Sequence, residues 1–192
     1  MFENIIGHEN IKKLFTDDNY VLRNTYVMEG VDGIGKKMMA LEIANKIAQY
    51  LQNILLIQSE KALAVDDIRP ISDFIYRFPF GKDNKRVVII DNCHTMNNVC
   101  QNMLLKLLEE PPEFAIFFLI TSDVSSLLDT IISRANVLRF NGISVDDIYD
   151  MLSSKIKDTG LLRFVSVVID GAISIAVNID DKLDYFTQLY GC

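Results

Sequence analysis

One stretch sets the architecture of this chain: Gly30-Val31-Asp32-Gly33-Ile34-Gly35-Lys36-Lys37. Its spacing is that of a phosphate-binding loop, G-x-x-x-x-G-K-[ST], whose backbone N–H groups and following helix N-terminus surround phosphate oxygens while the lysine reaches the outer phosphates. The position of the hydroxyl residue that ligates Mg²⁺ holds Lys37 instead. We therefore expect a nucleotide-binding-type loop that lacks its metal ligand, formed by Gly30, Gly33, Gly35, Lys36 and Lys37.

Around this loop, short apolar runs alternate with longer helical patterns, which is typical of a parallel sheet flanked by helices. A helix after Lys36 is indicated by apolar residues every four positions, Met39, Ile43, Ile47 and Leu51. A second helix is predicted from Val99 to Glu110, where Pro111-Pro112 ends it. The predicted strands, nearly all apolar and hence buried on both faces, are Tyr26–Glu29, Ile54–Ile57, Val87–Ile90, Ile116–Ile120 and Val137–Phe140.

The pattern changes after Phe140, which indicates a domain boundary. Asn141-Gly142 breaks the chain, and the segment Ser144 to Asp147 is typical of a capping box that opens a helix. From there to Cys192 the pattern is helical, with Gly160 and Gly171 as expected helix ends. We predict an α/β domain at residues 1–140 and a small lid domain of about three helices at residues 141–192.

Composition excludes several classes of protein. The chain has 192 residues, of which 49% are hydrophobic and 23% charged, so it is globular rather than disordered. A net charge of −7 argues against a dedicated DNA-binding module. The three cysteines form no C-x-x-C pair, which predicts neither zinc nor disulfides. Without a signal sequence or an apolar run of ~20 residues, we expect a cytoplasmic protein with no membrane contact.

The residues that would support hydrolysis depart from the usual pattern. An ammonium cannot coordinate Mg²⁺, so at Lys37 the metal should be held weakly or not at all. Asp91 ends an apolar strand, where its carboxylate can hold Mg²⁺ or its water shell, or simply cap the following turn. Asn92 follows where ATPases of this layout carry a glutamate, and an amide cannot accept the proton of the attacking water. We therefore expect little or no ATP hydrolysis and no bound metal.

Other polar residues are candidates for the same site. Thr121 and Ser122 end the fourth predicted strand and can orient a γ-phosphate or a water. Arg134 precedes the fifth strand and can either enter a neighbouring subunit's site or form a weak surface ion pair. His8, His94 and the pair Glu109-Glu110 have no partners nearby in sequence that would make a catalytic or metal site, and we interpret them as structural or exposed.

Taken together, these segments resemble the clamp-loader branch of the AAA+ ATPases, and within it the δ′-type subunits of bacterial DNA polymerase III. The most specific element is the helix that ends in Glu109-Glu110-Pro111-Pro112, followed by Ser133-Arg134. The remaining matching segments are Ile5 to Glu9, Gly30 to Lys37, Val65 to Arg69, Val88 to Asp91 and Asn102 to Glu110.

The resemblance implies a function for these residues. In that family an arginine in the position of Arg134 enters the ATP site of the adjacent motor subunit, and Ala135 replaces the cysteine that usually follows. Ser174 stands where the lid usually supplies a phosphate-sensing arginine. From this resemblance we expect neither the zinc module that many bacterial members carry nor the C-terminal collar domain.

The function that follows is a δ′-like stator, a subunit that helps load the sliding clamp with a degenerate ATP site. Its expected partners are delta and gamma/tau-like clamp-loader subunits and, through the complex, the sliding clamp and primed DNA. No cofactor is required, although ATP or ADP can bind. Two alternatives stay open: an active gamma/tau-like ATPase motor subunit, and a regulatory nucleotide-binding module without a role in replication.

Overall fold

The computed structural model describes residues 2, 5–59, 61–82, 84–169 and 179–190, and within them the chain forms a five-stranded parallel sheet. The strand order is β2-β3-β4-β1-β5, so β1, which leads into the glycine loop, lies inside the sheet. All five predicted strands are confirmed, with ends shifted by one residue at most, but the expected burial on both faces is wrong for the outer strands β2 and β5, which are only partly buried because each pairs with one neighbour. The strands are β1 Thr25–Glu29, β2 Ile54–Ile57, β3 Arg86–Ile90, β4 Ala115–Thr121 and β5 Asn136–Arg139.

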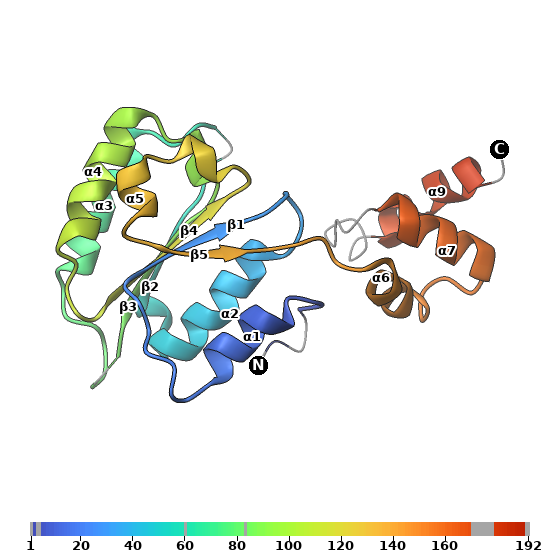
Figure 1. Ribbon diagram of the computed structural model, residues 1–192, viewed down its shortest axis with the longest axis horizontal. Coiled ribbons are helices and arrows are strands. Elements are labelled where there is room, and N and C mark those ends of the chain that lie inside the picture. The colour runs from blue at the N-terminus through green and yellow to red at the C-terminus, as the bar shows by residue number, and fades with distance from the viewer. Residues whose placement is uncertain (1, 3–4, 60, 83, 170–178, 191–192) are drawn as a thin grey trace.

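Helices cover both faces of the sheet, as Figure 1 shows. The α1 and α2 helices pack on one face, and α3, α4 and α5 pack on the other. Each face of the sheet therefore has its own core: the first core lies between the sheet and α1 and α2, and the second lies between the sheet and α3, α4 and α5. Successive strand residues alternate between them, since Tyr26 and Met28 belong to the first core and Val27 to the second. The helices of this part are α1 Glu9–Thr16, α2 Lys36–Ala48, α3 Val65–Ile75, α4 Asn98–Glu109 and α5 Asp129–Ile132, with short 3₁₀ turns η1 Leu51–Asn53, η2 Cys93–Thr95 and η3 Val124–Ser126.

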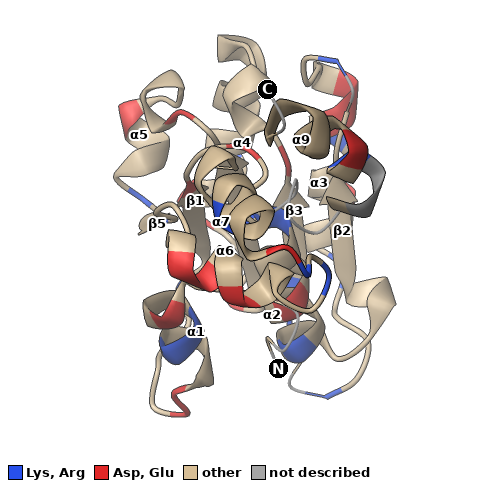
Figure 2. Cartoon of the chain, turned by 90° about the vertical axis from the view of Figure 1, so that its right-hand side faces the viewer, with Lys and Arg blue, Asp and Glu red and all other residues tan. Residues whose placement is uncertain are grey.

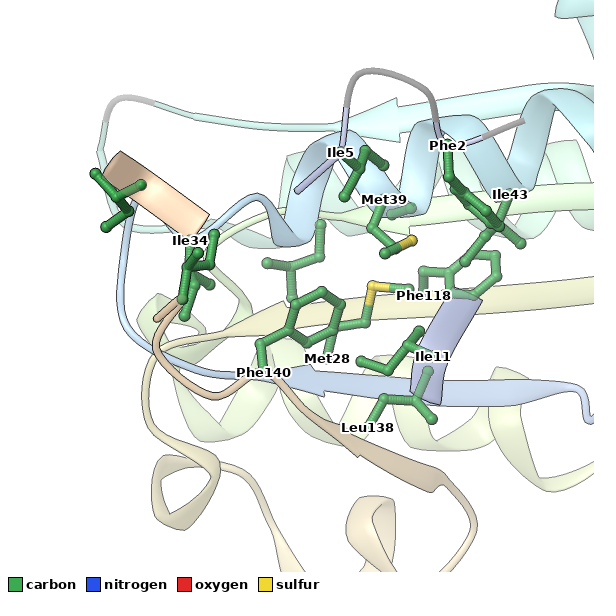
Figure 3. Packing of buried hydrophobic residues seen from close by; sticks show 14 of the residues in the cluster. Phe2, Ile5, Ile11, Met28, Ile34, Met39, Ile43, Phe118, Leu138 and Phe140 are labelled. Carbon is green, nitrogen blue, oxygen red and sulfur yellow. The ribbon is translucent and has the colours of Figure 1, made fainter. Parts of the chain in front are cut away.

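The glycine loop is part of the first core rather than a separate appendage. Its Ile34 is 1% exposed and belongs to the same packed cluster as Met28, Met39 and Phe140 (Figure 3). Burying such a side chain fully contributes about 1.5–3 kcal/mol. The loop therefore has a fixed place at the end of β1, held by the same contacts that hold α2.

Helix ends follow local chemistry, and one prediction about them is wrong. The α2 helix ends at Ala48, because Gln49 takes a left-handed backbone conformation (φ 58°). Leu51 was expected on the buried stripe of that helix, but it lies in η1 and is 77% exposed. The α4 helix agrees with the sequence: the Asn97 side chain caps its N-terminus at the Cys100 N–H, and prolines follow its end.

After β5 the chain is helical where the structure describes it, with α6 Val145–Leu152, α7 Thr159–Val168, η4 Ile179–Lys182 and α9 Leu183–Tyr190. These helices group together beyond the end of β5 (Figure 1). Ser144 caps α6 as predicted, by accepting the Asp147 N–H at 3.1 Å. Gly160 does not end a helix: Asp158 caps α7, and Gly160 lies in its first turn. Gly171 and Ser174 lie outside the described residues.

None of the helices in the described part of the chain is long and apolar enough to cross a membrane.

Candidate functional site

The glycine loop joins β1 to α2 at the carboxyl edge of the sheet. Gly33 (φ 79°) and Gly35 (φ 97°) take backbone conformations that favour glycine, and Gly35 is the N-cap of α2. Gly30 is needed for another reason, since a Cβ there would lie 2.6 Å from the carbonyl oxygen of Phe140, which follows β5. The loop thus combines two glycines required for its curvature with one required by close packing.

A second contact fixes the loop from outside. The Nε2 atom of His8 lies 3.1 Å from the Ile34 carbonyl oxygen, and its ring packs against Phe140 with centroids 4.7 Å apart. Burial lowers the pKa of His8, so the neutral ring is favoured, and its N–H can donate to that carbonyl. His8 is therefore structural, as the sequence indicated, and it links the N-terminal segment to the loop.

Lys36 lies over the loop with its side chain almost fully buried (6% exposed). Its ammonium donates to the carbonyl oxygens of Gly30 at 2.5 Å and Val31 at 2.8 Å, and it lies 3.6 Å from the Asp32 carboxylate. Burial lowers the pKa of Lys36, and Asp32 opposes that shift. The loop therefore presents a desolvated positive charge beside the N-terminus of α2, which is the arrangement that favours phosphate oxygens.

Lys37 pairs with Asp91, the carboxylate that the sequence predicted as a possible magnesium ligand. Its ammonium lies 3.1 Å from Asp91 Oδ2 and donates to Gln58 Oε1 at 2.5 Å. Gln58 and Asp91 meet there because β2 and β3 are adjacent, with Ile57 opposite Ile90. Together with Ser59 and Asn92, these residues line a cleft of about 330 Å³.

The donor set does not fit a magnesium ion at this position. Among the described residues that line the cleft, Asp91 is the one carboxylate, its Oδ2 is paired with an ammonium, and Lys37 has no lone pair to donate. Nor does the described part of the chain contain a group of three or more His, Cys, Asp or Glu side chains that could hold a metal ion. The residues present thus fit a phosphate group but not its usual divalent partner.

Asn92 occupies a turn rather than a catalytic position. Its backbone is left-handed (φ 53°), a conformation that asparagine tolerates better than glutamate does. The Asn92 N–H donates to Asp91 Oδ1 at 3.1 Å, and its carbonyl accepts the Thr95 hydroxyl at 2.8 Å. The turn therefore fixes the Asp91 carboxylate, while the Asn92 amide brings no base to the cleft.

Thr121 is the last residue of β4 and Ser122 follows it, and the side-chain hydroxyls of both have partners. The Thr121 hydroxyl, on a residue 1% exposed, donates to the Asp123 carbonyl at 2.8 Å and accepts the Asp123 N–H at 3.0 Å. The Ser122 hydroxyl lies 3.5 Å from His94 Nδ1. These contacts give Thr121 a structural role in the turn, and its contribution to phosphate binding stays a prediction.

Arg134 follows α5 and is held from α4. Its guanidinium donates to the Thr130 carbonyl at 2.9 Å and lies 3.3 Å from Glu109 Oε1, with side chains 39% and 46% exposed. Sequence reasoning missed this role of Glu109, because the two residues are 25 positions apart and meet only when α4 packs on α5. Gln58 was missed as well, although its position directly after a predicted strand was a usable signal.

Arg134 and the glycine loop of the same chain lie at opposite ends of the parallel strands. Strands β1 and β5 are parallel, with Tyr26 opposite Asn136 and Glu29 opposite Arg139. Arg134 therefore lies near the edge where β1 begins, whereas the glycine loop starts where β1 ends. At about 3.3 Å per strand residue, Arg134 and the start of the glycine loop are roughly 15 Å apart or more. The structure brings Lys36, Lys37 and Asp91 together and leaves Arg134 apart from them.

Charges of both signs are interspersed over the elements in the view of Figure 2, with acidic residues at the start of α6. Such a distribution does not attract nucleic acid by itself.

Comparison with known proteins places these features in a family context. The family model described as "DNA polymerase III, delta subunit" matches residues 48–144, a span that contains Asp91 and Arg134. The DNA polymerase III subunit gamma of Buchnera aphidicola from Schizaphis graminum is 28% identical over 93% of this chain. A crystal structure of a gamma-subunit-related protein from Thermotoga maritima superposes with a TM-score of 0.70 at 25% identity, over 91% of this chain and 57% of that chain.

A likeness in fold extends further. A RuvB mutant structure from Thermotoga maritima gives a TM-score of 0.67 at 18% identity, over 97% of this chain and 67% of that one. The chain spans 57% of the length of the Buchnera protein. Both DNA polymerase III relatives named here carry the name gamma, so the δ′-type assignment stays a prediction.

Proposed function

This chain belongs to the AAA+ clamp-loader family, to which DNA polymerase III gamma and delta subunits belong, and from that premise we propose that it is a stator-like subunit of a clamp loader in DNA replication. A stator here is a subunit that does not hydrolyse ATP itself and completes the site of a neighbour. Its partners would be delta- and gamma/tau-like subunits and, through the complex, the sliding clamp and primed DNA. The helices after β5 would form its lid.

The weakness of its own site supports this proposal. Lys37 forms an ion pair with Asp91, the carboxylate that would hold magnesium, and Asn92 occupies the position where an ATPase needs a base. Both changes affect groups needed in the transition state, for neutralising charge and for orienting water. Without them the loop retains groups that bind phosphate but lacks groups that activate its transfer.

The proposed role at a neighbouring subunit's ATP site depends on the position of Arg134. It is partly exposed, held by Glu109, and lies at the sheet edge away from its own loop. An arginine in that position can act only on a phosphate outside this chain. Supplied in trans to a phosphoryl-transfer site, an arginine accelerates the reaction by about 10³–10⁵-fold.

The test measures ATP turnover in a reconstituted clamp loader. In this loader the phosphate-loop lysine is mutated in every ATP site except the neighbouring site that Arg134 faces. We expect Arg134→Ala to lower ATP turnover at that site by about 10³-fold or more, with assembly unchanged by gel filtration. The matched control is Arg139→Ala, which removes another exposed arginine whose ion-pair partner among the described residues is Glu29. Unchanged turnover in Arg134→Ala, or an equal loss in Arg139→Ala, would refute the role in trans.

The second candidate is a gamma-type ATPase motor subunit, which the names of both DNA polymerase III relatives favour. It predicts that the purified chain hydrolyses ATP and that Lys36→Ala abolishes the activity. The stator proposal predicts no turnover above the level of that variant. ATP hydrolysis by the isolated chain therefore separates the two candidates.

A further inference from the structure

The contact between Lys37 and Asp91 has a consequence for how a nucleotide is held. The ammonium is within ion-pair distance of the carboxylate and also donates to Gln58, so it bridges the ends of two adjacent strands. Both residues line the cleft, and the Lys37 side chain is 41% exposed while that of Asp91 is 15% exposed. A positive charge is thus fixed to the protein at the carboxylate that follows β3.

A magnesium ion and this ammonium exclude one another. Both need the Asp91 oxygens, and two cations within a few ångströms repel each other strongly in a partly buried cleft. A hydroxyl side chain would give magnesium a second oxygen ligand at the position of Lys37, whereas the ammonium removes a ligand and adds a charge of the same sign. Magnesium binding is therefore disfavoured on both counts.

The Lys37 ammonium can nevertheless do what a magnesium ion does for a bound nucleotide, which is to neutralise the negative charge of the phosphate groups. The Lys37 ammonium lies 3.1 Å from Asp91 Oδ2, and the charge of Asp91 also opposes the lowering of the pKa of Lys36, so both ammonium groups lie near this carboxylate at the start of α2. Lys37 keeps two of its three N–H donors when it pairs with a single acceptor, and one when it pairs with both Asp91 and Gln58. It can therefore donate to a phosphate oxygen without leaving Asp91.

We propose that Lys37 is a built-in replacement for the divalent cation, so that this chain binds a nucleoside triphosphate without metal. The inference rests on the phosphate-loop part of the proposed function and is independent of Arg134. Because a free triphosphate carries more negative charge than its magnesium complex, the loop should prefer the metal-free form. Magnesium then leaves the affinity unchanged or weakens it.

The experiment is a titration of the purified chain with a fluorescent ATP analogue, once with magnesium and once with EDTA. We expect binding in EDTA that magnesium does not strengthen. Lys37→Thr, which restores a hydroxyl, should weaken binding in EDTA by about tenfold and recover it when magnesium is added. Lys37→Arg keeps a cation and should remain independent of metal, and thermal melting confirms that each variant is folded.

The matched control is Lys13→Thr, which removes the same charge from an exposed position on α1 and should leave both titrations unchanged. The inference is overturned if the wild-type chain binds about tenfold more tightly with magnesium than with EDTA, or binds in neither condition. It is also overturned if Lys37→Thr remains independent of metal. None of these results changes the outcome of the Arg134 experiment, so failure of the two proposals is distinguishable.

Discussion

The first glycine of the loop offers a test of why the loop has its shape. Gly30→Ala adds one carbon that would lie 2.6 Å from the Phe140 carbonyl oxygen and 2.8 Å from Phe140 Cβ. Carbon atoms in favourable contact are about 3.5 Å apart, so the second approach is about 0.7 Å too short. Neither Phe140 atom can move by side-chain rotation, and the Phe140 N–H is bonded to the Glu29 carbonyl at 2.7 Å.

Relief of this clash requires a shift of β5 relative to β1. Overpacking of this kind costs about 1–3 kcal/mol, and a clash with backbone atoms belongs at the upper end, near 3 kcal/mol. For a chain of this size each kcal/mol lowers the melting temperature by about 2–4 °C, so we expect a decrease of about 6–12 °C. Thermal unfolding followed by circular dichroism measures it.

Gly142→Ala is the matched control, because a Cβ at Gly142 meets no atom within 4 Å. It should change stability by less than about 0.5 kcal/mol. If Gly30 served only the approach of a phosphate, Gly30→Ala would melt within about 2 °C of the wild type and lose nucleotide binding alone. That outcome would refute the packing argument.

Three further predictions concern residues around the site and core. Arg86→Met removes a guanidinium that donates to three backbone carbonyls at 2.7–3.2 Å, and it should cost about 3 kcal/mol in urea denaturation. Arg69→Met, which breaks an exposed ion pair, should cost under about 0.5 kcal/mol, and equal losses would contradict this reasoning. Burial lowers the pKa of His8 from 6.5, so the unfolded chain takes up the proton first. Wild-type stability should therefore fall as the pH drops from 6.5 through the folded-state pKa, and the urea midpoint of His8→Gln should vary less with pH. Burial raises the pKa of Cys93 to about 12, and Cys100 is also buried. Both thiols should resist iodoacetamide at neutral pH until urea unfolds the chain, and peptide mapping of labelled native protein would reveal the contrary.

The sheet could be predicted from sequence because its strands are marked by local composition, which does not depend on knowing which distant residues they contact. Strands β1, β3 and β4 are largely apolar runs of five to seven mostly buried residues, and each is followed by a glycine or a polar residue. The errors have local causes. The apolar spacing continues to Leu51 although the helix has already ended at a left-handed Gln49. Gly160 suggested a helix end, but the Asp158 side chain two positions earlier begins a new helix.

The chemistry of the site needed the tertiary structure. The sequence indicated that Lys37 cannot hold magnesium, but its pairing with Asp91 depends on the packing of α2 against β3. In the same way, Glu109 read alone is a solvated helix end, and its contact with Arg134 arises from the packing of α4 and α5. Spacing along the chain contains no information about which of these partners a long, flexible side chain selects.

The decisive measurement is steady-state ATP hydrolysis by the purified chain in excess magnesium, compared with its Lys36→Ala variant. A site in which an ammonium pairs with Asp91 and Asn92 replaces the base should give the same turnover in both proteins, equal to the background without protein. Turnover in the wild-type chain that Lys36→Ala abolishes would contradict this account and identify the chain as an ATPase.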